Sequence, residues 1–300
     1  IDMNQIPIFV FHVGNPSYLN LMIMQAQKSE NVVHLLGDDS NKGICDNWAS
    51  VEDYVPKDYL YFEKIFAQMS DYPLAFDLNC FKRFFVMRES MQRNSIKKMI
   101  FADSDLMIFS NLSDFYHKNI CGASLSIPKR QDNYRWTAQA HSSFWTIEHL
   151  SDFLDFVQGE YVNHIDVLTE KYKYHLKNSV KGGVCDMTLL YLWSLNKDDI
   201  LNTAIVNNGM TFDHCIGEAS NYLDNEFKYN RILRIKAVGF DDVGVYCTTI
   251  NGQRVHMHTL HCQGAAKPMM AHIYNKNLNT FGAYKDRYLE GFNRIARKQK

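Results

Sequence analysis

The sequence predicts an α/β fold in which a mixed, mostly parallel sheet is flanked by helices. Residues 6–13 (IPIFVFHV) and 31–36 (NVVHLL) are apolar runs typical of buried strands, and residues 18–27 between them have a helical pattern. Because two strands joined through a helix normally lie parallel in one sheet, this order predicts a βαβ unit. Ligands of such sheets bind at the carboxyl ends of the strands, which here are residues 13–14 and 37–39.

Local spacing predicts the elements around this unit. Residues 14–16 (GNP) end the first strand, and Ser17 is a candidate N-cap for the helix that follows. Residues 40–58 are polar and rich in turn formers, so we expect a loop there with some local helix. In residues 77–92 the apolar side chains recur at helical spacing, which predicts a helix with one packed face. Arg83 lies beside that face, where it could bind phosphate or form an ordinary surface ion pair.

Residues 98–109 (KMIFADSDLMIF) are the stretch most indicative of chemistry. An apolar run typical of a buried strand meets Asp103 and Asp105, and a second apolar run follows. Because side chains alternate along an extended backbone, both carboxylates can project to one side, with Ser104 on the other. Two oxygen ligands so placed suit Mg²⁺ or Mn²⁺, which often bind through carboxylates and substrate phosphates. The competing interpretation is a pair of solvated aspartates at a strand end.

The middle of the chain alternates between strand-like and helix-like segments. Residues 121–127 and 142–147 are typical of strands, and the polar, aromatic-containing segment 129–139 separates them. A long irregular stretch between strands is more often functional than idle, so this segment is a candidate to hold an acceptor. Residues 149–157 and 165–174 are amphipathic and predict helices that pack against the core.

Two turns punctuate the second half of the chain. The Gly-Gly pair at 182–183 precedes another predicted helix, and Asp186 at its start either caps that helix or belongs to a site. Further on, the strand-like runs 243–249 and 254–260 flank Asn-Gly at 251–252. This dipeptide favours a β-hairpin with a type I′ turn.

His261 stands at the end of the second hairpin strand, ahead of a loop that contains Gly264 and Lys267. A lone histidine is usually structural, but one that points at a carboxylate pair can complete an octahedral metal site. A lysine close by can offer positive charge to a phosphate. The sequence therefore holds a second candidate segment for the site that begins with Asp103 and Asp105.

Composition excludes several classes of protein. Three hundred residues, 46% of them hydrophobic, can bury a large core, and we expect one domain. The net charge of -1 gives no basic field to attract nucleic acid, and no run of about 18 apolar residues offers a transmembrane span. The seven cysteines are scattered without a CxxC pair, which argues against disulfides and structural zinc and favours a reducing, cytoplasmic compartment. The four basic residues in 294–300 could contact an anionic membrane weakly, although a solvated end is the simpler interpretation.

Three segments resemble one known family. The run CFKRFFVMRE, followed by KKMIFADSDLMIFSNLSDFY, resembles the metal-site core of glycosyltransferase family 8, the group of glycogenin and the bacterial lipopolysaccharide galactosyl- and glucosyltransferases. The spacing His261-x-x-Gly264-x-x-Lys267 is similar to the family's C-terminal His-x-x-Gly-x-x-Lys-Pro-Trp motif, with Met269 in place of the tryptophan. Asp186 stands where the family usually carries an Asp-Gln-Asp type segment.

The resemblance implies a GT-A fold and transfer of a sugar from a nucleotide-diphosphate donor, a UDP-sugar above all, to a glycan or other hydroxyl acceptor. In this family the anomeric configuration is retained. By carry-over, Asp103, Asp105 and His261 would hold Mn²⁺ or Mg²⁺. The donor would contact four residues around the ion: Arg83, Ser104, Gly264 and Lys267. The resemblance further implies a single domain in which residues 1–120 bind the nucleotide, and residues 121–300 bind the acceptor and also carry the C-terminal metal and diphosphate motif.

This chemistry explains why such groups are needed. Breaking the bond between sugar and diphosphate places negative charge on the leaving oxygen, which a divalent ion and Lys267 can offset. The anomeric centre becomes oxocarbenium-like, and Asp186 is the candidate catalytic carboxylate that could stabilise it. Two alternatives stay open. One is a haloacid-dehalogenase-like Mg²⁺ phosphatase, in which the later pair Asp241 and Asp242 would join the site, and the other is a catalytically silent module that binds nucleotide sugars.

Overall fold

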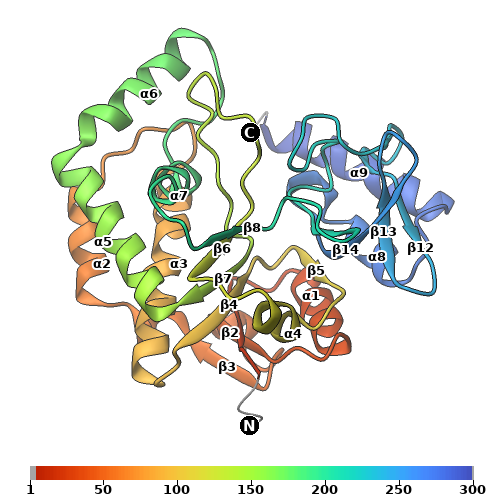
Figure 1. Ribbon diagram of the computed structural model, residues 1–300, viewed down its shortest axis with the longest axis horizontal. Coiled ribbons are helices and arrows are strands. Elements are labelled where there is room, and N and C mark those ends of the chain that lie inside the picture. Colours follow the sequence, from red (N-terminus) through yellow and green to blue (C-terminus); the bar gives the residue numbers. More distant parts are fainter. Residues whose placement is uncertain (1–4, 299–300) are drawn as a thin grey trace.

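A seven-stranded sheet runs through the middle of the molecule (Figure 1). The computed structural model describes residues 5–298, with side chains described as far as residue 289. In the strand order β3-β2-β1-β4-β7-β6-β8, β7 is antiparallel to both of its neighbours and the remaining pairs are parallel. The strands are β1 (Ile8–Phe11), β2 (Val33–Gly37), β3 (Asn47–Ser50), β4 (Lys98–Ala102), β6 (Ala123–Leu125), β7 (Ser142–Thr146) and β8 (Ile200–Asn202). The predicted mixed, mostly parallel sheet is confirmed.

Helices cover both faces of this sheet. Figure 1 shows α2, α3, α5, α6 and α7 on one face and α1 and α4 on the other. The helices are α1 (Ser17–Lys28), α2 (Lys57–Ile65), α3 (Leu74–Arg93), α4 (Leu112–Lys118), α5 (Ile147–Asn163), α6 (Ile165–Lys177), α7 (Asp186–Ser194), α8 (Met269–Tyr274) and α9 (Phe281–Lys298). Within residues 5–298 there are also three short 3₁₀ helices: η1 (Asp39–Asn41), η2 (Val51–Tyr54) and η3 (Gly264–Ala266).

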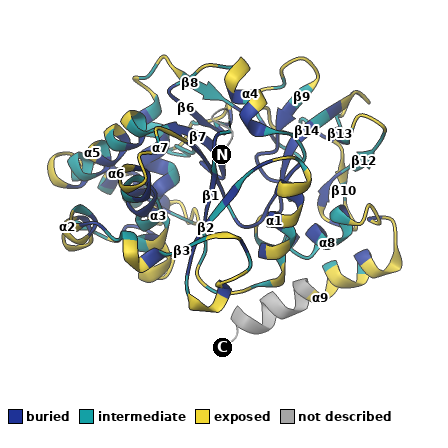
Figure 2. Ribbon diagram, turned by 90° about the horizontal axis from the view of Figure 1, so that it is seen from below, coloured by how far each residue is buried: buried dark blue, intermediate teal, exposed yellow. Residues whose placement is uncertain are grey.

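The alternation of side chains along the strands divides the interior into two cores. In β4, Ile100 packs with the core under α1 and α4, whereas Met99 and Phe101 pack with the core under α3 and α5. The same alternation places Phe144 of β7 in the first core and Trp145 in the second. Because both faces are covered, the central strands are buried while the outer helix faces are exposed, as Figure 2 shows by its colours.

A second sheet begins where the central strand of the first one ends. Its order is β12-β13-β14-β5, with β9 paired in parallel to β14. The strand β5 follows β4 after three residues, 103–105, so this short segment connects the two sheets. The strands are β5 (Leu106–Ile108), β9 (Met210–Phe212), β12 (Val238–Phe240), β13 (Val245–Thr248) and β14 (Arg254–His261), and a separate two-stranded ribbon is made of β10 (Tyr229–Asn230) and β11 (Ile235–Lys236).

The predicted βαβ unit is confirmed, since β1 and β2 pair in parallel on either side of α1. The N-cap prediction is wrong, because Ser17 is the first residue of α1 and Pro16, which has no side-chain oxygen to offer, occupies the cap. The expected loop at 40–58 contains the two short helices η1 and η2, but it also contains β3, which sequence patterns did not predict. β3 has no fully buried side chain, so the alternation that marks a half-buried strand is missing from it.

The predicted hairpin between β13 and β14 is confirmed, but its turn is not type I′. A type I′ turn needs positive φ at both central residues, and Asn251 is not among the residues with positive φ. The Gly252 N–H instead donates to the Thr249 carbonyl, and Gly252 itself has a φ of 86°. This is the three-residue loop in which a type I turn is followed by a left-handed glycine.

The expectations about cysteines and membranes have a partial outcome. All seven cysteines are free thiols in this fold. Among the residues described, we find no helix whose length and apolar content would let it cross a membrane. The expected weak membrane contact of the basic residues in 294–300 falls on side chains outside the described ones.

Candidate functional site

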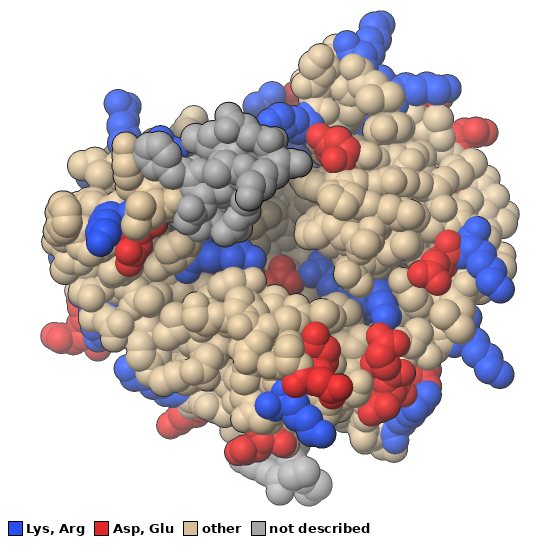
Figure 3. All heavy atoms as spheres, turned by 180° about the vertical axis from the view of Figure 1, so that it is seen from behind, with Lys and Arg blue, Asp and Glu red and all other residues tan. Residues whose placement is uncertain are grey.

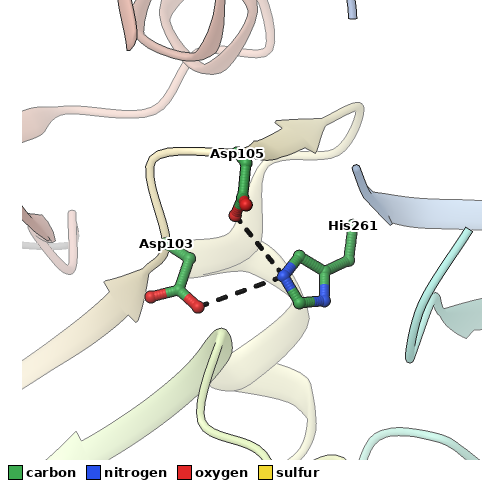
Figure 4. Close-up of side chains that lie close together, drawn as sticks. All are labelled: Asp103, Asp105 and His261. Carbon is green, nitrogen blue, oxygen red and sulfur yellow. Dashed lines mark ion pairs between the residues drawn. The ribbon is translucent and has the colours of Figure 1, made fainter. Parts of the chain in front are cut away.

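The two sheets meet at three side chains, Asp103, Asp105 and His261 (Figure 4). Asp103 and Asp105 occupy the segment that connects β4 to β5. His261 is the last residue of β14, and the antiparallel pairing of β14 with β5 sets it opposite Leu106. Strand pairing therefore brings residues 155 positions apart to one place.

The three side chains present a compact set of possible ligands. Nε2 of His261 lies 3.4 Å from Oδ1 of Asp105 and 4.0 Å from Oδ2 of Asp103. One ligand atom from each residue lies within 4.8 Å of the others. Asp105 and His261 are buried, and Asp103 is partly exposed. The predicted convergence of the Asp-x-Asp segment with His261 is present in the fold.

Hydrogen bonds fix how His261 faces the carboxylates. Its Nδ1 lies 2.9 Å from the backbone carbonyl oxygen of His214. A carbonyl oxygen only accepts hydrogen bonds, so Nδ1 carries the proton in this contact. In the neutral ring, Nε2 is then left with its lone pair pointing between Asp103 and Asp105 (Figure 4).

A fully buried ion pair stands behind His261. The backbone N–H of His261 donates to Oδ2 of Asp213 at 2.9 Å, and Oδ1 of Asp213 lies 2.8 Å from Nζ of Lys236. Both side chains of the pair have zero exposure. Lys236 also donates to the carbonyl of Cys215, and His141 stacks flat on the imidazole of His261 with ring centroids 4.0 Å apart.

The charges in the site are not balanced evenly. Burial raises the pKa of Asp103, and the nearby Asp105 adds to this effect against the opposing charge of Arg83. Burial alone would raise the pKa of Asp105 too, but hydrogen bonds and charges from His261 and Lys267 hold that pKa well below the usual range. Burial opposes protonation of His261, yet the contact with Asp105 raises its pKa overall. The cluster thus attracts positive charge.

Arg83 links this cluster to Asp186. Its Nη1 lies 2.8 Å from Oδ1 of Asp103, and its Nη2 lies 2.5 Å from Oδ2 of Asp186. Asp186 is the first residue of α7 and is buried, while Cys185 occupies the N-cap without a side-chain cap bond. The capping interpretation of Asp186 is therefore wrong, and its carboxylate faces the site through Arg83.

Lys267 closes the other side of the cluster. Its Nζ lies 3.1 Å from Oδ2 of Asp105 and 3.3 Å from the hydroxyl of Tyr18, and it sits over the Tyr18 ring at 4.6 Å from the centroid. Gly264, with a φ of 61°, begins the short helix η3 that leads to Lys267. A positive φ is easily adopted by glycine, so the loop can turn back toward Asp105 here.

A cavity of 630 Å³ lies over these groups. It is lined by all eight residues that the family resemblance and its chemistry assign to the site: Arg83, Asp103, Ser104, Asp105, Asp186, His261, Gly264 and Lys267. Figure 3 shows one face of the molecule hollowed near its centre, with acidic and basic side chains next to each other in the hollow. His141 also lines the cavity, and no sequence pattern indicates it beyond its place just after the irregular segment 129–139.

Comparison with known proteins adds structural likenesses only. No family model matches the chain, and no curated protein is similar to it. Among solved structures, it is similar to mouse xyloside xylosyltransferase 1, at 10% identity over 66% of this chain and 84% of that one, with a TM-score of 0.46. It is also similar to the galactosyltransferase LgtC, at 12% identity over 95% of both chains with a TM-score of 0.43. The bifunctional glycosyltransferase WbbM matches at 10% identity over 97% of this chain and 52% of that one, with a TM-score of 0.48. At such low identities and scores these likenesses carry no argument about activity, so function is argued from the site.

Proposed function

We propose that this chain is a metal-dependent glycosyltransferase of the GT-A type, related to glycosyltransferase family 8. It would move a sugar from a nucleotide-diphosphate donor, most simply a UDP-sugar, to a hydroxyl acceptor such as a glycan, with retention of configuration. The observation that carries the proposal is that Asp103, Asp105 and His261 converge with Lys267 under one cavity. A cytoplasmic location and a single domain are parts of this proposal. Residues 1–120 would bind the nucleotide, and residues 121–300 would bind the acceptor and supply the C-terminal metal and diphosphate motif.

The donor set fits a divalent cation. Two carboxylates and a neutral imidazole suit Mn²⁺ or Mg²⁺, and Nδ1 of His261 is already committed to the His214 carbonyl, which leaves Nε2 free to bind. A cation bound by Asp103, Asp105 and His261 would offset negative charge on the diphosphate as the sugar leaves. Burial, with the nearby charge of Asp105, raises the pKa of Asp103, and a bound cation would offset this cost of keeping the carboxylate charged.

The chain's own groups supply the rest. Lys267 holds an ammonium beside Asp105 at the cavity, where it would contact the diphosphate and stabilise the charge that develops there. Ser104 and Gly264 line the same wall and would contact the donor. Three of the five N–H groups of Arg83 are in hydrogen bonds to the described residues, which leaves two for the donor.

Asp186 is the proposed catalytic carboxylate. It is buried, lines the cavity and is held by Arg83, so its charge stays fixed beside the place where the sugar would lie. A fixed carboxylate near the anomeric carbon can stabilise an oxocarbenium-like transition state. Because Arg83 binds Asp103 as well, it would also hold Asp186 at a constant distance from the cation site.

The phosphatase alternative is not favoured by the geometry. It requires Asp241 and Asp242 beside Asp103, but Asp241 contacts His256 and Arg254 in the second sheet. The one cluster of possible metal ligands among the described residues contains neither aspartate.

Three variants test the proposal against both alternatives. The wild type should bind UDP only with Mn²⁺ present and should slowly hydrolyse UDP-glucose or UDP-galactose. Asp105→Asn keeps the size of the side chain and should abolish both. Lys267→Met should keep Mn²⁺ binding and lower turnover about a hundredfold, the usual scale for removing one group that stabilises developing charge. The matched control is Asp241→Asn, which should hydrolyse the donor at the wild-type rate.

Each failure has its own meaning. Cleavage of simple phosphoesters that is lost in Asp241→Asn would replace the proposal with a phosphatase. Binding of UDP and Mn²⁺ without hydrolysis of any donor or transfer would leave a silent module. Full turnover by Asp105→Asn would remove the metal site from the mechanism.

A further inference from the structure

A second cavity of 520 Å³ adjoins the 630 Å³ cavity over Asp103 and Asp105, where the donor would bind. The two share three lining residues, Tyr72, Cys185 and Met187, so the second cavity begins next to the catalytic candidate Asp186. Its other walls come from the irregular segment between β6 and β7, from α6, from residues 180–183 after α6, and from the first turn of α7. A molecule bound there would lie within reach of a donor sugar near Asp186.

The walls of the second cavity are positively charged, although the whole chain has a net charge of -1. Four basic side chains line it, and one carboxylate, Asp132, accompanies them. The basic residues are Arg130, Arg135, Lys171 and Lys181. Arg130 pairs with Asp132 at 2.8 Å, but Arg130 and Arg135 reach Asp224 only at 3.8 Å each. Within the described part of the chain, Lys171 and Lys181 have no carboxylate partner. The cavity wall therefore carries positive charge that no nearby carboxylate among the described residues compensates.

Lys171 is the most unusual of these groups because it is almost fully buried, with 1% exposure. Its Nζ donates to the backbone carbonyls of Tyr134 at 2.7 Å and Arg135 at 3.1 Å. An ammonium has three N–H groups, so one remains for a ligand in the cavity that Lys171 lines. Burial without a counter-charge lowers the pKa of Lys171 to about 8. An anion in the cavity would remove that cost.

The same lysine holds an aromatic wall in place. Asn133, Tyr134 and Trp136 have φ values of 56°, 57° and 34°. Asparagine adopts this left-handed conformation readily, but it is costly for the bulky Tyr134 and Trp136. The Tyr134 ring packs against Trp136 at 4.9 Å and against Tyr174 of α6 at 5.0 Å. Trp136 and Tyr174 line the cavity, and flat aromatic surfaces of this kind suit the apolar face of a sugar ring.

We propose that the second cavity is the acceptor subsite and that it takes an acceptor sugar carrying an anionic group, a carboxylate or a phosphate, held by Lys171, Lys181 and Arg130. This rests on the proposed glycosyltransferase function. In the transfer, an acceptor hydroxyl oxygen forms the new bond to the anomeric carbon. The bond from that carbon to the diphosphate breaks with its electron pair left on the diphosphate, and the hydroxyl proton passes to solvent or to the departing diphosphate.

Direct binding tests the charge preference without a donor or a metal. The probes are glucose, glucuronate and glucose 6-phosphate. The binding of each to the protein is measured by ligand-observed NMR titration at low and high salt. We expect one or both acidic sugars to bind at least tenfold more tightly than glucose, as charge-assisted hydrogen bonds imply, and to weaken with salt. The two acidic probes distinguish a carboxylate from a phosphate. Equal affinity for all three sugars would overturn the proposal.

Exposed side chains provide variants that should not disturb folding. The double variant Arg130→Gln/Lys181→Gln should lose most of the preference for acidic sugars. Lys177→Gln is the matched control, because Lys177 is an exposed lysine of α6 outside the cavity, and it should bind like the wild type. An undiminished preference in the double variant would overturn the assignment of the cavity. Lys171→Met adds a second measure where it folds, since it should lower affinity for the acidic probe at pH 7.

Transfer assays separate this inference from the proposed function. With UDP-sugar and Mn²⁺, acidic acceptors should give lower KM values than neutral ones. Donor hydrolysis together with equal use of neutral and acidic acceptors would overturn the inference and leave the function standing. Tight binding of acidic sugars without any donor turnover would overturn the acceptor role itself.

Discussion

Replacing Lys236 by methionine tests whether a buried ion pair supports the site. Lys236 and Asp213 are both fully buried, and their charged atoms lie 2.8 Å apart. Methionine keeps much of the length of the lysine side chain but removes its charge, so Asp213 is left as an uncompensated buried anion. Breaking a buried pair in this way costs about 3–5 kcal/mol. The second oxygen of Asp213 accepts a hydrogen bond from the backbone N–H of His261, so a shift of Asp213 should also displace His261 in the candidate metal site.

Urea unfolding monitored by tryptophan fluorescence measures the loss. With an m-value of about 3 kcal/mol/M, a loss of about 4 kcal/mol moves the midpoint by about 1 M. The matched control is Lys82→Met, which breaks the ion pair with Glu52, whose side chain is 75% exposed. That pair should contribute less than about 1 kcal/mol.

A double-mutant cycle gives the decisive comparison. Asp213→Leu/Lys236→Met removes both charges, so it should be more stable than Lys236→Met alone, because no unpaired charge remains buried. If Lys236→Met destabilises the protein no more than Lys82→Met does, the pair does not hold the region together. If the double variant is as unstable as the sum of its single variants, the cost comes from lost packing rather than from charge.

Two further predictions concern pH and backbone strain. Burial lowers the pKa of His258 to about 4 from its usual 6.5, so between these pH values the unfolded chain binds a proton that the folded chain excludes. The free energy of unfolding should therefore fall by about 3 kcal/mol through this group as pH drops from about 6.5 to about 4. Equilibrium unfolding of His258→Phe across that range should show a shallower loss. An unchanged pH dependence in this variant would refute the assignment. Gly183 has a φ of 138°, and a Cβ there would lie 2.2 Å from the Met69 carbonyl oxygen, so Gly183→Ala should lower the melting temperature. The matched control is Gly159→Ala, which adds a methyl group in open space within α5 and should leave the melting temperature equal or raise it. Equal melting temperatures for the two variants would contradict the predicted clash.

The central part of the fold could be predicted because its signals are local. Apolar runs mark β1, β2 and β4, and the Asp-x-Asp segment follows directly from the end of β4. The position of His261 beside the two carboxylates could also be anticipated, since a histidine at a strand end near a glycine and a lysine matches a known spacing. What decided its place, the pairing of β14 with β5, is a contact over about 155 positions that periodicity does not encode.

The polar support of the site could not be predicted. Asp213 and Lys236 lie in a turn-rich region with short strands, and neither shows a periodic pattern. Their burial depends on each other, because a charge enters the interior only with its partner. The helix α2 was also missed, although Tyr59 and Phe62 are its buried residues at helical spacing and Pro56 precedes its first turn. The Asn-Gly signal correctly located the hairpin but not the turn type, since Gly252 alone adopts positive φ.

The pairing of β14 with β5 makes the candidate metal site sensitive to alignment along a whole strand. In an extended strand, a slip of one residue turns every side chain to the opposite face. One residue inserted or deleted between Arg254 and Leu260 would therefore present a neighbour in place of His261 opposite Leu106, without altering any of the three candidate ligands. Mn²⁺ affinity would then report an error made several residues away. For a chain like this one, tolerance to single-residue insertions in β14 should be lower than burial alone implies, because the cation would select for one alignment of the second sheet.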